Sequence, residues 1–496
     1  MATHKVCGIE TEYGIHTVGG DSNPIAASSV LVNAYIAEAD RRTRWDFEDE
    51  TPGKDARGTT REGAMPPLVE THLANTVLTN GARFYVDHAH PEYSTPECGD
   101  PLEAVLHDKA GEEVLRRSMA AAAALFPESP PVVVYKNNSD GKGNSYGCHE
   151  NYLMDRSVPF GQVIAGVVPH FVTRQIFTGA GKVGTETATF DRGEVPFQVS
   201  QRAEFFEEVV GLETTLKRPI VNTRDEPHAD PSRFRRLHVI VGDANLSEVA
   251  TFLKLGTTAV VLAMVEDGIQ PPRDLAPSDP VRAMHQVSAD LGLARPLDLA
   301  DGSSATALEI QWELLTAARK YAEERGLEAI GPDTVATSVL DRWEAVLHGL
   351  ETDPAALAHE LDWVAKYQLV LAYKDRHGCQ WDDDRLFALD LQYHDLRPSR
   401  SLHARLSTER LVDPEAVARA VTEPPPDTRA WFRGQCLARW PDAVVTANWD
   451  SLVFDLGTDP LRRVPMMDPL KGTAEHTSAL LDASASPAEL LDRLSS

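Results

Sequence analysis

Residues 80–97 hold a dense group of side chains able to do chemistry, with the sequence NGARFYVDHAHPEYSTPE. The Asn80–Gly81 pair predicts a turn, and the alternating residues after it predict a β-strand. Because side chains two residues apart share a strand face, Arg83, Tyr85 and Asp87 should point one way and their apolar neighbours the other. A cation, a phenol and a carboxylate in one row are costly to bury without partners, so this face predicts a charged cleft. A half-exposed strand with a surface salt bridge is the alternative interpretation.

Two further stretches show the same alternation. The first, residues 6–14, places Glu10 and Glu12 on one face, and residues 236–241 place Arg236 and His238 on one face of another strand. Three strands offering charged groups from one side predict a sheet whose concave face is an active site. Carboxylates with a few imidazoles suit Mg²⁺ or Mn²⁺, and arginines suit phosphate oxygens. The residue types therefore indicate a site for a nucleotide and a metal ion.

Other segments are candidates to border this site. Residues 41–67 are polar and contain glycine and proline, which predicts either a loop over the site or a tolerated insertion. Residues 136–152 predict a glycine-rich loop without the P-loop pattern. His149, at the end of that loop, is either a metal ligand or a hydrogen-bonded side chain. Trp449 is suited to stack on a nucleobase, although a place in the core is the commoner role of tryptophan.

Composition bounds the class of protein. The 496 residues are 42% hydrophobic, which predicts a folded chain with a large core and more than one domain. We expect a large domain over residues 1–409 and a small one over residues 410–496. The net charge of −27 argues against nucleic acid or an anionic membrane as the partner.

Cysteine usage and hydropathy point to a cytoplasmic protein. The five cysteines have no paired spacing, which predicts a reducing compartment, no zinc site and buried thiols: Cys7, Cys98, Cys148, Cys379 and Cys436. The N-terminus lacks the apolar region of a signal peptide. The apolar stretch 259–265 is too short to span a membrane and should be a buried segment.

Four motifs together resemble the Pup ligase and depupylase family, whose members attach or remove the prokaryotic ubiquitin-like protein Pup. They are residues 8–14 (GIETEYG), 80–97, 146–154 (YGCHENYLM) and 236–245 (RLHVIVGDAN). The resemblance covers nearly the whole chain. It implies the α+β fold of the carboxylate–amine ligases related to glutamine synthetase, in which a curved, mainly antiparallel sheet packed on helices cradles the active site.

Within the family, two features resemble the depupylases rather than the ligases. One is the amino-acid sequence of residues 85–92 (YVDHAHPE), and the other is the polar insertion 41–67. The resemblance therefore implies a hydrolase that cleaves the isopeptide bond between the C-terminal glutamate of Pup and a substrate lysine. It also implies deamidation of a C-terminal glutamine of Pup, a cytoplasmic location and a functional link to the bacterial proteasome.

The resemblance also implies roles for individual residues. Asp87 matches the catalytic aspartate, either as a nucleophile that forms an anhydride or as a general base for water. The implied magnesium ligands are Glu10, Glu12, Tyr85, Glu92, His149 and His238, the last standing where glutamine synthetase has a glutamate. The implied ATP contacts are Arg83, Thr95 and Trp449. Amide hydrolysis is downhill, so ATP would be a bound cofactor without obligatory net consumption. Candidate contacts to the acidic Pup chain are Arg218, Arg224, Arg235 and Arg397.

Three alternatives remain at this stage. A Pup ligase would form the same isopeptide bond while hydrolysing ATP. A small-molecule carboxylate–amine ligase would turn over ATP with free glutamate or amines in the absence of Pup. A catalytically dead Pup-binding protein would bind Pup without turnover, and the set of Asp87, Glu10 and Glu92 argues against it.

Overall fold

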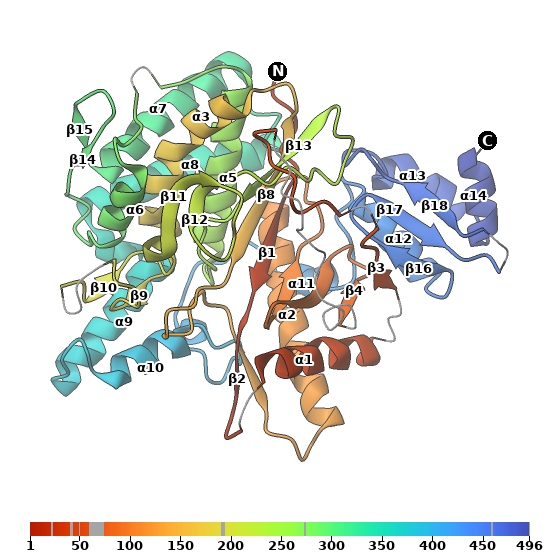
Figure 1. Cartoon of the computed structure of the whole chain (residues 1–496), viewed down its shortest axis with the longest axis horizontal. Helices are drawn as coiled ribbons and strands as arrows, with labels where there is room; N and C mark the ends of the chain where they lie inside the picture. The colour runs from red at the N-terminus through yellow and green to blue at the C-terminus, as the bar shows by residue number, and fades with distance from the viewer. Residues whose placement is uncertain are drawn as a thin grey trace.

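A ten-stranded sheet forms the centre of the computed structural model, which describes residues 1–20, 23–39, 43–48, 50–58, 74–189, 194–271, 274–457 and 460–495 (Figure 1). In sheet order its strands are β13 (Phe234–Val239), β8 (Cys148–Asp155), β1 (Cys7–Glu12), β6 (His90–Ser94), β5 (Arg83–Asp87), β4 (Asn75–Val77), β3 (Arg44–Trp45), β16 (Val444–Ala447), β17 (Ser451–Phe454) and β18 (Arg462–Pro465). All neighbouring strands are antiparallel except β3 and β16, which are parallel. This arrangement confirms the expected α+β class with a mainly antiparallel sheet.

The three strands expected to carry the site all form. Their alternation is as predicted, because residues 82, 84 and 86 enter the apolar core while the polar side chains at 83, 85 and 87 line a cavity. Gly81 has φ of +82° in the turn before β5, a left-handed conformation that glycine adopts without strain.

A layer of helices covers the sheet near β8 and β13 and holds the largest apolar core (Figure 1). Its members are α3 (Phe160–Thr173), α4 (Gln175–Thr178), α5 (Glu248–Glu266), α6 (Pro280–Ser288), α7 (Ala307–Arg325) and α8 (Asp333–Thr352). Ser247 caps the N-terminus of α5, where its Oγ accepts a hydrogen bond from the Ala250 amide at 3.1 Å. The apolar stretch 259–265 lies inside α5 and is buried, as expected.

Helix α5 is longer than the apolar stretch alone indicates. Among the described helices it is the one long and apolar enough to cross a membrane, yet 94% of its most apolar 18-residue segment is buried inside the protein. Core helices of this kind meet the same criteria of length and composition, so they give only weak evidence for a membrane span.

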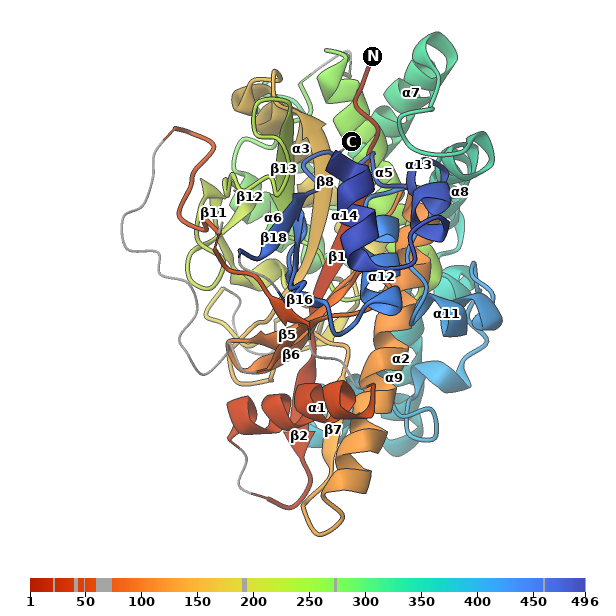
Figure 2. The same ribbon diagram turned by 90° about the vertical axis from the view of Figure 1, so that its right-hand side faces the viewer.

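The remaining elements up to residue 420 lie around the main sheet, outside its ten strands. These helices are α1 (Pro24–Glu38), α2 (Pro101–Leu125), α9 (Asp362–His377), α10 (Asp384–Tyr393) and α11 (Pro414–Ala420), with 3₁₀ turns η2 (Ala203–Phe205), η3 (Pro354–His359) and η4 (His403–Arg405). The short strands outside the sheet are β2 (Gly14–Thr17), β7 (Val132–Tyr135), β9 (Lys182–Val183), β10 (Phe197–Gln198), β11 (Phe206–Gly211), β12 (Arg218–Asn222), β14 (Leu297–Asp298) and β15 (Ser304–Ala305). Figure 2 shows α1 below β5 and β6, α2 running upward to one side of these strands, and α13 and α14 beside the upper part of the sheet.

One expectation about local structure was wrong. The predicted loop 136–152 ends at residue 147, because Cys148–Asp155 form strand β8, which pairs with β1 on one side and β13 on the other. The alternation of polar and apolar residues does not reveal this strand, because its buried face includes Glu150. The Glu150 carboxylate accepts hydrogen bonds from Arg174 at 2.6 and 2.8 Å. A buried ion pair replaces the apolar residue that alternation would require.

The C-terminal part of the chain extends the main sheet. Strands β16, β17 and β18 continue it past β3, and α12 (Ala430–Arg439), α13 (Ala474–Asp482) and α14 (Pro487–Ser495) share a separate apolar core with them. Helix α11 instead packs on α2 of the larger part. The division at residue 410 stays a prediction. The five cysteines are unpaired and buried, as predicted.

Candidate active site

Strand pairing brings the polar faces of β1, β5, β6, β8 and β13 together. In the register of the sheet, Glu10 of β1 lies opposite both His149 and Ser94, and Glu92 of β6 lies opposite both Glu12 and Tyr85. Directly opposed residues have Cβ atoms about 4.5–5.5 Å apart, so these side chains must interact. They line a cavity of about 1330 Å³.

The structure places nearly all the predicted site residues around this one cavity. Its lining includes Glu10, Glu12, Arg83, Tyr85, Asp87, Glu92, His149, His238 and Trp449. The remaining residue, Thr95, lines a smaller adjoining pocket. Residues dispersed over more than 430 positions of sequence therefore meet at one place.

The first group of possible metal ligands is Glu10, His149 and His238, each with a ligand atom within 4.8 Å of the others. His149 Nδ1 lies 3.6 Å from Glu10 Oε2, and the two imidazole rings stand edge to face at 4.9 Å. The Nε2 atom of His238 is buried and has no hydrogen-bond partner among the described residues. An unpartnered imidazole nitrogen beside a carboxylate fits a divalent cation.

Asn151 supports this group from behind. Its Nδ2 donates to Glu10 Oε1 at 2.7 Å, and its Oδ1 lies 3.1 Å from His238 Nδ1 and accepts from Arg236 Nη1 at 2.6 Å. Hydrogen bonds from a neighbouring residue to the ligating side chains fix the orientation of those side chains toward the metal ion. The sequence signal was present, because Asn151 follows His149 by two residues on the same face of β8.

The second group is Glu12, Asp87 and Glu92, again within 4.8 Å. Burial, reinforced by the charges of Asp87 and Glu12, raises the pKa of Glu92 well above its usual range. Burial also opposes ionisation of Glu12, but His90, 3.4 Å away, and the nearby His149 and Arg202 lower its pKa to about 2. Crowded buried carboxylates of this kind need a cation, which fits Mg²⁺ or Mn²⁺ with its preference for oxygen ligands.

Glu10 is also held in its ionised form. Burial acts to raise its pKa, but the nearby His149 and the charges of His238 and Arg236 lower it well below its usual range. Both groups therefore contain a carboxylate ready to bind a metal ion.

Asp87 stands at the end of β5 and is partly exposed to the cavity. Its Oδ2 lies 2.7 Å from Nδ1 of His88, the next residue. His88 has φ of +51°, a left-handed backbone conformation that is uncommon outside glycine. The hydrogen bond to Asp87 and its charge raise the pKa of His88 to about 9.

Arg83 lies in an aromatic cage. Its guanidinium carbon is 3.9 Å from the centre of the Trp45 ring and 3.8 Å from that of Tyr85. Glu50 lies 4.0 Å from Arg83 and accepts a hydrogen bond from Trp45 Nε1 at 2.6 Å. Arginine is suited to such stacking because its guanidinium is planar and weakly hydrated.

Trp45 and Glu50 belong to the polar segment expected over the site. Residues 43–48 and 50–58 of the predicted 41–67 loop are described, and the rest of that loop lies outside the described residues. The segment also reaches the loop after β12, where the Thr51 amide donates to Glu226 at 2.5 Å and the Ala56 amide donates to the Thr223 carbonyl at 2.8 Å. Its described part therefore borders the cavity, consistent with a loop over the site.

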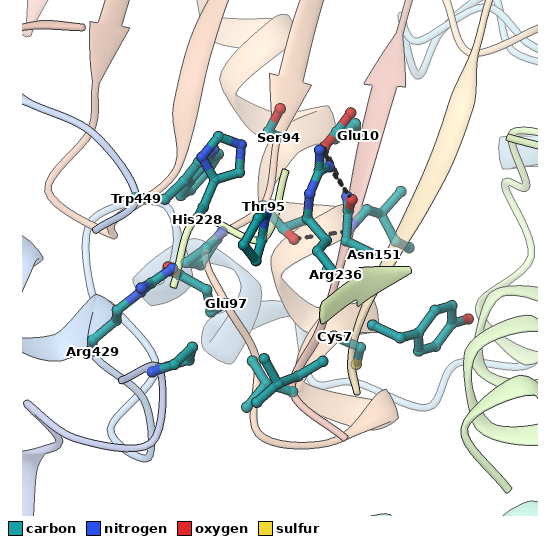
Figure 3. A pocket seen from close by; sticks show the side chains of 18 residues that line it. Cys7, Glu10, Ser94, Thr95, Glu97, Asn151, His228, Arg236, Arg429 and Trp449 are labelled. Carbon is teal, nitrogen blue, oxygen red and sulfur yellow. Dashed lines mark hydrogen bonds and ion pairs between the residues drawn. The ribbon is translucent and has the colours of Figure 1, made fainter. Parts of the chain in front are cut away.

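The smaller pocket has a volume of about 80 Å³ and opens beside the first ligand group. Figure 3 shows Trp449 and His228 on one side of it and Glu10, Arg236 and Asn151 on the other. Thr95 lies in its wall, where its Oγ1 accepts a hydrogen bond from the Ile9 amide at 3.0 Å. An aromatic face beside polar groups is suited to a nucleobase or ribose.

Two arginines line the cavity wall, and only one of them is identified from the sequence as a candidate contact. Arg218 was among the candidate Pup contacts, and it donates to the Ser145 carbonyl at 2.6 Å. Arg202 was missed because it stands in an irregular turn before η2 with no periodic pattern around it. Burial and the charge of Arg218 lower the pKa of Arg202 to about 10.

Of the other three candidate Pup contacts, one lines the cavity and two do not. Arg224 also lines the cavity, and its Nε is buried without a partner among the described residues. Arg235 instead points to the opposite face of β13, where its Nη1 donates to the Val158 carbonyl at 2.8 Å. Arg397 forms an ion pair with Asp395 at 2.6 Å and is not among the described residues that line the cavity.

Related proteins match the chain over its whole length. A "Depupylase" of Acidothermus cellulolyticus is 53% identical, and a "Pup deamidase/depupylase" of Mycolicibacterium smegmatis is 48% identical, each over 99% of both chains. A "Pup--protein ligase" of Xylanimonas cellulosilytica is 38% identical over 97% of this chain and 99% of its own.

Solved structures show the same relationship. The Pup ligase PafA in complex with Pup superposes with a TM-score of 0.80 at 31% identity, covering 99% of this chain and 95% of its own. PafA in complex with ADP gives a TM-score of 0.74 at 34% identity, covering 82% and 89%. The family described as Pup-ligase protein matches residues 5–453. This match confirms the resemblance drawn from the four motifs, and the chain belongs to that family.

Proposed function

We propose that this protein is a depupylase and Pup deamidase. It hydrolyses the isopeptide bond between the C-terminal glutamate of Pup and a substrate lysine, and it converts a C-terminal glutamine of Pup to glutamate. Both reactions attack the carbon of a γ-carboxamide, so one site serves both.

The observation that carries this proposal is the position of Asp87 in a cavity of about 1330 Å³, beside two groups of metal-competent side chains, in a chain 48–53% identical to proteins named depupylase over nearly its full length. A Pup ligase is the second candidate, because two proteins named Pup--protein ligase are 38% and 42% identical to this chain over 97% and 83% of its length. The higher sequence identity to the depupylases and the His-Ala-His motif of residues 88–90 favour the hydrolase.

Magnesium and ATP are proposed cofactors. Glu10, His149 and His238 would hold one ion, and Glu12, Tyr85 and Glu92 would hold others. Bound Mg²⁺ supplies neutralisation of phosphate charge and polarisation of the substrate carbonyl. The proposal for ATP is supported by the ADP complex of the related PafA. Arg83, Thr95 and Trp449 are the proposed contacts, and Trp449 gives the smaller pocket an aromatic wall on which a nucleobase could stack.

Asp87 is the proposed catalytic residue. As a nucleophile, its carboxylate attacks the carboxamide carbon, the amine leaves, and water opens the resulting anhydride. As a general base, it takes a proton from a water molecule that attacks the same carbon. In either case the reacting group is the Asp87 carboxylate, which lines the cavity beside Glu12 and Glu92.

Pup and pupylated proteins are the proposed partners, supported by the Pup complex of the related PafA. Acidic Pup would pair with arginines at the cavity, of which Arg218 and Arg224 are the best placed. We also propose a cytoplasmic location and a role beside the bacterial proteasome, consistent with five unpaired, buried cysteines.

The test is incubation of a purified Pup-conjugated protein with this enzyme, Mg²⁺ and ATP, alongside an Asp87→Asn control. Release of free Pup and intact target, lost in the control, is the expected result. If the enzyme instead forms conjugates from separate Pup and target while ADP accumulates in proportion, it is the ligase. Binding of Pup without either reaction would contradict both enzymatic assignments.

A further inference from the structure

His88 has an unusual combination of backbone and side-chain geometry. It is one of four described non-glycine residues with positive φ, at +51° directly after strand β5. In this conformation the chain turns at once toward β6, whose first residue, His90, pairs with Asp87. A residue in the left-handed region costs conformational energy, which persists only where the surroundings determine it.

The turn brings the imidazole of His88 back onto Asp87. Its Nδ1 lies 2.7 Å from Asp87 Oδ2, while about 66% of the His88 side chain remains exposed. The ring therefore contributes little to the core, and its principal described polar contact is the carboxylate of the proposed catalytic residue. Asp87 itself is only 30% exposed and has Glu12 and Glu92 as neighbours.

A carboxylate at the end of a strand can rotate about its side-chain bonds. A hydrogen bond to one oxygen restricts that rotation and leaves the other oxygen to approach a reactant. Neighbouring carboxylates repel Asp87, so a hydrogen-bond donor is needed to hold its carboxylate in place. This donor need not itself bind a metal ion. His88 is the described side chain that donates to it.

We infer that His88 is a positioning residue that orients the Asp87 carboxylate toward the substrate carboxamide. The inference rests on the proposed function, because Asp87 must act in the reaction for its orientation to matter. It assigns to His88 no contact with substrate and no transfer of a proton. The same loss should follow for isopeptide cleavage and for deamidation, since both begin at Asp87.

Two variants separate the side chain from the backbone. His88→Gly removes the hydrogen bond while adopting positive φ without strain, and His88→Asn keeps a short side-chain donor in a residue that tolerates this conformation. His348→Asn on the exposed face of α8 is the matched control for an unrelated histidine. Thermal unfolding of each variant establishes that it folds.

The measurement is kcat and KM for release of Pup from a conjugate and for deamidation of Pup ending in glutamine. His88→Gly should lower kcat roughly 10- to 100-fold on both substrates with KM nearly unchanged, the range expected for a displaced reacting group. His88→Asn should recover much of that loss, and His348→Asn should match the wild type.

Other results would overturn the inference. These are a wild-type or raised kcat in folded His88→Gly, a loss confined to the isopeptide substrate, or an effect on KM alone. Asp87→Asn separates this failure from that of the proposed function. If Asp87→Asn is inactive while His88→Gly is unaffected, only the positioning role fails. If Asp87→Asn keeps full activity, the catalytic assignment on which the inference rests fails as well.

Discussion

Glu10 lies directly opposite His149 across the β1–β8 pair, with His149 Nδ1 3.6 Å from Glu10 Oε2. These residues come from segments almost 140 positions apart in sequence. Their juxtaposition depends on the register between the two strands, because a shift by one residue would turn one of the side chains to the opposite face. The proposed metal site is therefore a property of the sheet rather than of either motif alone.

The Glu10–His149 pair predicts a measurable metal dependence. Chelation with EDTA should abolish Pup release, and added Mg²⁺ should restore it. In Glu10→Gln, the concentration of Mg²⁺ needed for half-maximal thermal stabilisation in the presence of ATP should rise at least about 10-fold, since one anionic ligand is lost. Identical Mg²⁺ titrations of the variant and the wild type would show that Glu10 is not a ligand.

The two roles open to Asp87 predict different isotope patterns. Over many turnovers in H₂¹⁸O, a nucleophilic Asp87 should acquire ¹⁸O in its side chain, because water can open the anhydride at the aspartyl carbonyl. A general base should leave Asp87 unlabelled while ¹⁸O enters only the glutamate of Pup. Peptide mass spectrometry of the recovered enzyme makes the distinction, with enzyme incubated without substrate as its control.

Glu97 should be important for the stability of the junction between β6 and the C-terminal part. Its carboxylate is paired with Arg429 at 2.7 Å and with Arg433, and both guanidinium groups are almost fully buried. Removing one partner of a buried ion pair typically costs about 3–5 kcal/mol. We expect Glu97→Gln to lower the free energy of unfolding by that order, as measured by urea denaturation at pH 7.

The contribution of Glu97 should also depend on pH. Burial opposes its ionisation, but the charges of Arg433 and Arg429 lower its pKa to about 2, from an ordinary value of 4.5. Its stabilising effect is therefore complete above pH 4.5 and is lost as the pH falls toward 2. The difference between the wild type and Glu97→Gln should shrink over that window. Glu489→Gln, which removes an exposed pair with Arg493, should change stability little at any pH.

Glu103 predicts the opposite pH dependence. Burial raises its pKa to about 8, against the effect of a hydrogen bond from the Gly99 amide at 2.7 Å. The folded state therefore holds a proton that the unfolded state releases, so this residue lowers stability as the pH rises from 4.5 to 8.

Replacing Glu103 with glutamine removes that titration but keeps an oxygen to accept the Gly99 hydrogen bond. The melting temperature of Glu103→Gln relative to the wild type should increase between pH 5.5 and 8.5. A constant difference across this range would mean that Glu103 ionises in the folded protein as it does in the unfolded chain.

Local sequence predicted the strands that carry the site because their side chains alternate. Arg83, Tyr85 and Asp87 were assigned to one face from a period of two, and the structure places all three on the cavity. The same argument failed for β8, since buried Glu150 is satisfied by Arg174, a residue of a distant helix end. A buried charge can be recognised only when its partner is known.

Local sequence specifies which side chains are available and which face of each strand they occupy, since the side-chain period of a strand is set by its backbone geometry. The position of β1 between β6 and β8, which brings Glu10 to His149 and Glu12 to Glu92, arises only when the whole sheet assembles. The same assembly places Asn151 behind the first ligand group and Arg202 at the cavity wall. Pairing between distant strands is fixed by the cooperative burial of the whole core, which no local pattern encodes.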